Sequence, residues 1–252
     1  MLYSEQNMYE NEIKKYLEKH DFETFNPKAV LFDMDGVLYN SMPNHAYSWH
    51  KSMESFNIPM TEAEAYKYEG MRGVETIKLK VREVLHKEIS DEEAQRMYDE
   101  KSRMFSLCPP ANIMEGVKEL QEKIKTDGMK IVVVTGSGQH SLLSKLVHDF
   151  EGLIKPELIV SAFDVKHGKP NPEPYLKGLD KADVKPWEAI VVENAPLGVR
   201  AAVAADIFTI AVNTGPLPDS MLGNEGANLI FTKMTDLCRE WENIRNAAAT
   251  II

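Results

Sequence analysis

The sequence has little cysteine, no long apolar run and a deficit of positive charge, and each shortage excludes a class of protein. Its 252 residues include two cysteines, Cys108 and Cys238, which are far apart and offer neither metal-ligand spacing nor a disulfide framework. No apolar run approaches the roughly 20 residues of a membrane span. The net charge of −10 disfavours nucleic acid and anionic membranes as partners, because both attract a basic face.

The first residues, "MLYSEQNMYENEIKKYLEKH", lack the apolar centre of a secretory signal. We therefore expect a cytoplasmic protein, and we expect it to be a monomer. Ile13, Tyr16 and Leu17 recur at helical spacing, which predicts a helical extension at the N-terminus. With 43% hydrophobic and 27% charged residues, the chain has the composition of an ordinary globular protein.

What is present is a series of short, continuous apolar segments rich in β-branched residues. Apolar sequence that is continuous rather than alternating is typical of strands buried on both faces of a parallel sheet. From residue 130 onward helical patterns separate these segments, so we predict an α/β fold with a Rossmann-like open parallel sheet. The expected strands cover residues 29–33, 130–136, 157–162, 189–194, 207–212 and 228–231.

The interval between the first two strands is much longer than a crossover requires. From Gly36 to Met129 it holds 94 residues, whereas a parallel crossover needs about a dozen or somewhat more. Most of it has apolar positions at helical spacing, which indicates a helical cap inserted into the core fold. The helical patterns cover residues 44–56, 73–86 and 91–105.

The chain returns from this insertion at "CPPAN", where Pro109 and Pro110 stop the preceding helix. A helix over about 113–126 then leads back to the second strand. These boundaries predict a helical extension over 1–25, a catalytic core over 26–41 and 109–252, and a helical cap over 42–108. In such an arrangement the site is expected between the core and the cap.

Polar residues follow the ends of four expected strands. In open α/β sheets, ligands bind beyond the carboxyl ends of the strands, so these side chains are expected to share one edge. The first strand delivers Asp33 and Asp35. The other loops deliver Thr135, Gly136, Ser137, Lys169, Glu193 and Asn194.

This set of residues suits phosphoryl transfer. Asp33 can attack phosphorus and carry the phosphoryl group, while Asp35, on the same side of an extended chain, can move the proton. A metal ion is needed to bring the anionic nucleophile to an anionic phosphate, and Mg²⁺ prefers oxygen ligands. Thr135, Ser137 and the amides after Gly136 form an anion cradle at a helix N-terminus, while Lys169 adds a fixed positive charge.

Four segments of the sequence together resemble the motifs of a known protein family. "DMDGVL", "VVVTGSG", "GKPNPEPY" and "VVENAPLGVRAA" are similar, in order, to the four motifs of the haloacid dehalogenase-like superfamily. The long insertion resembles that of its helical-cap branch, which includes β-phosphoglucomutases and small phosphatases. The resemblance covers about 29–232. Each motif alone is weak, but four in order at fitting spacing are highly specific.

The resemblance implies particular roles. Asp33 is expected as nucleophile, Asp35 as general acid/base, and Thr135 and Lys169 as contacts to the phosphate. The implied Mg²⁺ ligands are the Asp33 carboxylate, the Asp35 backbone carbonyl and the fourth-motif residues Glu193 and Asn194. The candidates for binding a small phosphorylated substrate are Gly136, Ser137, His45, Glu69, Arg72 and Lys101.

Two positions bear on the substrate. Many relatives carry two acids in the fourth motif, whereas Asn194 here leaves the site one negative charge lighter. Glu69, in "YKYEGMRG" of the cap, is an unusual choice beside an anionic substrate unless it reaches the metal or binds a hydroxyl or water. Together with the long motif segments, these two residues look like an inorganic pyrophosphatase of the cap-bearing branch, so pyrophosphate is the expected substrate.

Other interpretations stay open. The same Asp33 and Asp35 chemistry serves a β-phosphoglucomutase, which is an isomerase, or a sugar-phosphate phosphatase, and a non-catalytic module that binds phosphorylated ligands is a third class. Plain structural roles are the alternatives for single residues. They are a solvated turn for Asp33 and Asp35, a surface position for Lys169, helix capping for Thr135 and Ser137, helix packing for His45, and solvated positions for Glu69, Arg72 and Lys101.

Overall fold

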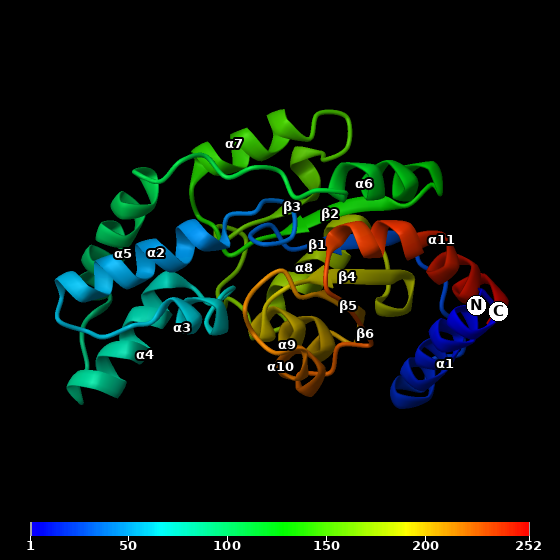
Figure 1. The fold of residues 1–252 in the computed structure, drawn as a ribbon, viewed down its shortest axis with the longest axis horizontal. Helices are drawn as coiled ribbons and strands as arrows, with labels where there is room; N and C mark the ends of the chain where they lie inside the picture. Colours follow the sequence, from blue (N-terminus) through cyan, green and yellow to red (C-terminus); the bar gives the residue numbers. More distant parts are fainter. Residues whose placement is uncertain (1, 252) are drawn as a thin grey trace.

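The computed structural model describes residues 2–251, and its centre is a single parallel sheet (Figure 1). The strand order β3-β2-β1-β4-β5-β6 places β1 in the middle, between β2 and β4. This arrangement confirms the α/β prediction, and each of the six expected segments contains a strand. The strands are β1 (Ala29–Phe32), β2 (Lys130–Val134), β3 (Ile159–Val160), β4 (Ala189–Glu193), β5 (Phe208–Val212) and β6 (Leu229–Phe231).

Helices cover both faces of the sheet, which explains why its strands are continuously apolar. Along β1, Val30 and Phe32 belong to one buried cluster, while Ala29 and Leu31 belong to the other. On the first face lie α1 (Leu2–His20), α6 (Val117–Thr126), α7 (His140–Asp149) and α11 (Met234–Thr250). On the second face lie α8 (Glu173–Ala182), α9 (Pro196–Ala204) and α10 (Asp219–Asn224). Short 3₁₀ turns, η1 (Pro156–Leu158) and η2 (Pro186–Glu188), lead into β3 and β4.

Four further helices lie beyond one end of the sheet, at the left of Figure 1. They have a buried cluster of their own, in which Trp49, Met53 and Ile77 are prominent. The helices are α2 (Met42–Ser55), α3 (Glu62–Lys67), α4 (Gly73–Leu85) and α5 (Asp91–Ser106). We refer to this group as the α2–α5 unit.

The helix predicted from about residue 113 begins later. Ile113 forms an isolated bridge with Tyr39, and the Met114 amide donates to the Leu38 carbonyl at 2.8 Å. Gly116, at φ +84°, then turns the chain into α6 at Val117. A tertiary contact thus keeps the first residues extended despite their helical spacing.

The N-terminal helix is part of the main fold. α1 runs beside α11, and both termini lie at the end of the molecule away from the α2–α5 unit (Figure 1). Tyr16 of α1 is buried, its ring packs edge-on against Phe208 of β5, and its hydroxyl donates to the Asp206 carbonyl at 2.8 Å. The predicted helix at the N-terminus is therefore present.

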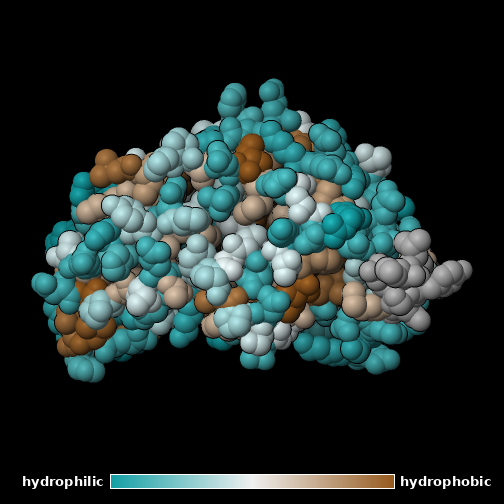
Figure 2. All heavy atoms as spheres, viewed as in Figure 1, coloured by the Kyte–Doolittle hydropathy of each residue, from teal (hydrophilic) through white to brown (hydrophobic). Residues whose placement is uncertain are grey.

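The visible surface is mostly hydrophilic, with small separate apolar patches (Figure 2). Among residues 2–251, every helix is too short or too polar to cross a membrane. The cytoplasmic location, the monomeric state and the lack of nucleic-acid partners stay predictions.

Candidate active site

Three charged residues meet under the carboxyl end of the central strands. Lys169 Nζ lies 2.5 Å from Asp33 Oδ1 and 2.6 Å from Glu193 Oε1, and it also donates to the Val134 carbonyl at 3.1 Å. Lys169 is 1% exposed and Asp33 is 4% exposed. A surface position for Lys169 and a solvated turn at Asp33 are therefore both wrong.

This cluster carries an excess of negative charge. Burial raises the pKa of Asp33 well above its usual range, Lys169 opposes the shift, and the carboxylates of Glu193 and Asp35 add to it. Burial would lower the pKa of Lys169, but Asp33 and Glu193 together raise it. Asp33 and Glu193 therefore share one ammonium, with the Asp35 carboxylate nearby, and such an excess of negative charge attracts a divalent cation.

Glu193 has both of its oxygens occupied. Oε1 accepts from Lys169 and from the Tyr175 hydroxyl at 2.7 Å, and Oε2 accepts from the amides of Asn194 and Ala195. In this arrangement Glu193 acts as the buried counter-charge of Lys169.

Two buried oxygens nearby lack partners in the part of the chain that the structure describes: Asp33 Oδ2 and Asn194 Oδ1. Gly36, at φ +85°, lets the Asn194 amide approach, because a Cβ there would lie 2.0 Å from Asn194 Nδ2. Within residues 2–251, no group of three His, Cys, Asp or Glu side chains is placed so that it could hold a metal ion by itself. Mg²⁺ keeps several waters and needs few protein oxygens, so the residues present fit this ion.

Asp35 is held by residues of the α2–α5 unit and its linker. Ser41 Oγ donates to Asp35 Oδ1 at 2.6 Å, and His45 Nε2 lies 3.1 Å from the same oxygen. Burial would raise the pKa of Asp35, but His45, Ser41 and Lys101 together lower it to about 2. Asp35 is therefore ionised in this state.

Lys101 completes a chain of hydrogen bonds to Asp35. Its Nζ lies 2.8 Å from His45 Nδ1, and because an ammonium only donates, Nε2 is left as the donor to Asp35. Burial lowers the pKa of Lys101 to about 8, although Glu69 and Asp35 act in the opposite direction. Lys101 and His45 are thus placed at the site rather than in solvent.

The phosphate cradle predicted after β2 is compact. Thr135 is buried, and its Oγ1 accepts from the Ser137 amide at 3.0 Å. α7 begins at His140 after these residues. The loop after α3 closes over the cradle, because a Cβ on Gly136 would lie 3.4 Å from the Gly70 carbonyl.

Glu69 and Lys101 line the small cavity beneath that loop, which has a volume of about 40 Å³. Burial raises the pKa of Glu69, His45 and Lys101 oppose the shift, and Asp35 adds to it. Asp35, His45 and Ser137 also line this cavity. The structure therefore brings the predicted cap and core residues together around one space.

Arg72 is the exception among the candidates. Its guanidinium donates to the Lys166 carbonyl at 2.8 Å, and its side chain packs against Gly168 outside the residues that line the small cavity. It joins the α2–α5 unit to the core. Ser41 and Tyr175 are contacts that the sequence interpretation missed, since a lone hydroxyl six residues after Asp35 or within "PNPEPY" has no distinguishing pattern.

Comparison with known proteins agrees with this geometry. The haloacid dehalogenase-like hydrolase family model matches residues 30–212. A phosphorylated carbohydrates phosphatase of Thermotoga maritima is 32% identical, over 73% of this chain and 83% of that protein. A beta-phosphoglucomutase of Bacillus subtilis is 26% identical, over 86% and 97%. A solved structure of a proposed beta-phosphoglucomutase from Bacteroides vulgatus is 51% identical with a TM-score of 0.93, covering 96% of this chain and 99% of that one.

Proposed function

Because the chain belongs to the haloacid dehalogenase-like hydrolase family, we propose that it is a Mg²⁺-dependent phosphohydrolase that carries the phosphoryl group on Asp33. One observation supports this most directly. Lys169 fixes one Asp33 oxygen at 2.5 Å, while the other is buried without a partner among the described residues. A carboxylate that is oriented at the end of a central strand, with an ammonium beside it to favour its charged form, is suited to attack phosphorus.

Asp35 then handles the proton. As a carboxylate it accepts the proton of the water that hydrolyses the aspartyl phosphate, and as an acid it protonates the leaving oxygen. The His45 Nε2–H lies 3.1 Å away and can return a proton to it, with Lys101 behind His45. Thr135, Ser137 and the Gly136 amide hold the phosphate oxygens.

Asp33, the Asp35 carbonyl and Asn194 would hold Mg²⁺, with Glu193 orienting Lys169 beside them. The ion supplies charge neutralisation between the carboxylate and the phosphate. We further propose that residues 1–25 extend the core, that 26–41 and 109–252 form it, and that 42–108 form the cap.

The relatives favour a phosphorylated sugar over pyrophosphate. They are named as a phosphatase of phosphorylated carbohydrates and as beta-phosphoglucomutases. These names agree with the alternative interpretation of the sequence, a sugar-phosphate phosphatase or a β-phosphoglucomutase. The Glu69 carboxylate in the small cavity suits a sugar hydroxyl, which can donate to it. We therefore propose sugar phosphates as the first substrate class to test, with the mutase reaction included.

Pyrophosphate is the second candidate substrate, and the small volume of the cavity is the observation that supports it. The closed cavity has about 40 Å³, enough for about three water-sized groups, so a sugar ring requires the α2–α5 unit to move outward. A compact second phosphate next to Lys101 requires less space. In that case Glu69 must face the metal, since a carboxylate repels a bare phosphate.

Phosphorus NMR with Mg²⁺ separates these activities. The protein is incubated with glucose 6-phosphate, with pyrophosphate, or with β-glucose 1-phosphate and a trace of the 1,6-bisphosphate. We expect free phosphate to be released from the sugar phosphate, and we expect this release to stop when EDTA is added. Glucose 6-phosphate formed from the 1-phosphate would identify a mutase, and release from pyrophosphate alone would identify a pyrophosphatase. If Asp33→Asn turned over any of them at the wild-type rate, the proposed function would be wrong.

A further inference from the structure

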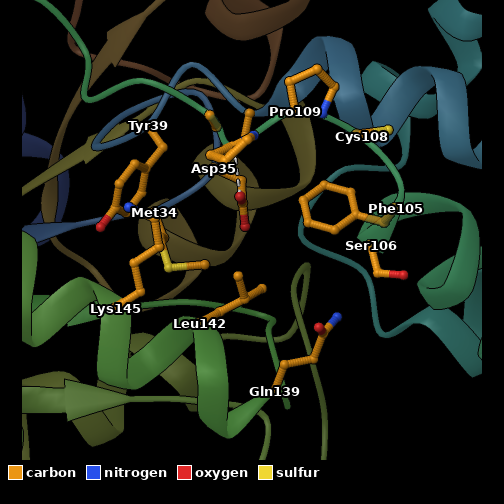
Figure 3. A pocket seen from close by; sticks show the side chains of 13 residues that line it. Met34, Asp35, Tyr39, Phe105, Ser106, Cys108, Pro109, Gln139, Leu142 and Lys145 are labelled. Atoms are coloured by element: carbon orange, nitrogen blue, oxygen red, sulfur yellow. Dashed lines mark hydrogen bonds between the residues drawn. The ribbon is translucent and has the colours of Figure 1, made fainter.

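A second and larger cavity lies on another side of Asp35 (Figure 3). Its volume is about 290 Å³, close to the lower limit of about 300 Å³ for small-molecule pockets. The end of α5, the linker after it, the loop after β1 and the start of α7 form its walls. The apolar part of its lining is made by Met34, Tyr39, Phe105, Pro109, Ala111 and Leu142.

The two cavities differ in charge. Lys101, His45 and Glu69 line the small one, whereas Lys145 is the cation among the residues that line the large one. Lys145 is already paired with Asp149, and its ammonium lies 5.2 Å from the centre of the Tyr39 ring. The large cavity is therefore poorly equipped to bind a second phosphate.

Asp35 borders both spaces. Its Oδ1 is held by Ser41 and His45, and in Figure 3 the residue lies among Met34, Phe105 and Leu142. The group that protonates a leaving oxygen must lie beside that oxygen. Whatever is attached to the leaving oxygen can therefore extend from Asp35 into either cavity.

We propose that the large cavity is a leaving-group site for phosphate monoesters of apolar alcohols, aryl esters above all. This inference rests on the proposed function and adds a further activity to it. An apolar ring displaces water from the mainly apolar wall, which favours binding, whereas a sugar ring would place polar hydroxyls against much of that apolar surface.

The reaction balances without another reagent. The Asp33 carboxylate forms a bond to phosphorus as the bond from phosphorus to the ester oxygen breaks. Asp35 receives a proton from His45 Nε2 as the Lys101 ammonium supplies one to His45 Nδ1. Asp35 passes this proton to the ester oxygen, and the neutral alcohol is left in the large cavity. Water then attacks the aspartyl phosphate, returns a proton to Asp35 and releases phosphate.

A filling variant tests the assignment. Ser106 is exposed and lines the large cavity, while its neighbour Leu107 is 70% exposed and does not line it. Ser106→Phe is expected to lower kcat/KM for 1-naphthyl phosphate, relative to glucose 6-phosphate and pyrophosphate, by about tenfold or more. The matched control Leu107→Phe is expected to keep the wild-type ratio. An unchanged ratio in Ser106→Phe, or an equal fall in both variants, would overturn the proposal.

Binding provides a readout that does not depend on turnover. In Asp33→Asn, the fluorescence of 1-naphthyl phosphate is titrated with and without Ser106→Phe. We expect the added substitution to raise Kd about tenfold. If Kd is the same in both, the leaving-group site is wrong. If Kd rises but no phosphate ester is hydrolysed by wild type, the proposed function fails while the binding site stands.

Discussion

The site lies between two walls that are stabilised in different ways: one is formed by the loops at the carboxyl ends of the strands (the core wall), and the other is formed by the α2–α5 unit (the α2–α5 wall). In the core, Lys169 and Glu193 are almost fully buried, and each bonds to several core groups. On the opposite wall, Arg72 reaches the core through a hydrogen bond to a backbone carbonyl while its side chain is 42% exposed. Buried charge that is bonded within the core suits a fixed chemical step. A wall that is joined to the core by few hydrogen bonds, such as those of His45 with Asp35 and of Arg72 with the Lys166 carbonyl, suits movement that admits substrate.

The largest effect is expected at Asp33, which tests whether the core wall carries the chemical step. Asp33→Asn removes the nucleophile but keeps its shape, so we expect phosphate release to fall by at least about a thousandfold. The measurement is steady-state phosphate release, with thermal unfolding as the folding control. Activity within about tenfold of wild type would mean that the core wall does not carry the chemistry.

Lys169 tests the buried charge itself. Lys169→Met leaves Asp33 and Glu193 facing each other without a cation, and removing one partner of a buried pair costs about 3–5 kcal/mol. Denaturant unfolding measures this loss in the free energy of unfolding. The double variant Lys169→Met/Glu193→Gln should recover part of it, and Lys181→Met, at the surface, serves as control. A loss no larger than that of the control would contradict the account.

Lys101 tests the opposite wall through pH. Its pKa of about 8 means that the ammonium loses its proton as the pH rises through 8, so we expect kcat/KM to fall there. Lys101→Arg keeps the positive charge, so the fall of kcat/KM on the alkaline side of the pH profile should move to higher pH. In the unfolded chain the pKa of this lysine is 10.5, so between pH 8 and pH 10.5 the unfolded state binds more protons than the folded state. The free energy of unfolding therefore carries the full cost of the buried charge below pH 8 and recovers as the pH rises from 8 to 10.5. A fall of kcat/KM at an unshifted pH in Lys101→Arg would assign the titration to another group.

Arg72 should give the smallest effect. Arg72→Ala removes one exposed hydrogen bond between the walls, so we expect KM to rise about threefold with little change in kcat. Arg82→Ala, which breaks a pair with Glu88 on α4, is the matched control. A hundredfold loss of kcat in Arg72→Ala would place this residue in the chemistry instead.

Much of the core was predictable from sequence because its signals are local. The continuous apolar segments predict all six strands, and the polar residues in the loops after them predict that Asp33, Lys169 and Glu193 meet. The features that were not predicted depend on contacts between distant residues. Ile113 pairs with Tyr39 instead of joining α6, and Arg72 turns toward Lys166. The role of Glu193 as counter-charge also depends on Tyr175, which only the folded chain brings to it.

The central claim is that Asp33 carries the phosphoryl group, and a rapid-quench experiment with ³²P-labelled sugar phosphate tests it most directly. Asp35→Ala slows hydrolysis of the intermediate, so acid quenching should trap ³²P on the peptide that contains Asp33. The label should be released by hydroxylamine, as an acyl phosphate is, and it should be absent from Asp33→Asn. Phosphate release without labelled protein at any time, or label retained in Asp33→Asn, would contradict the account.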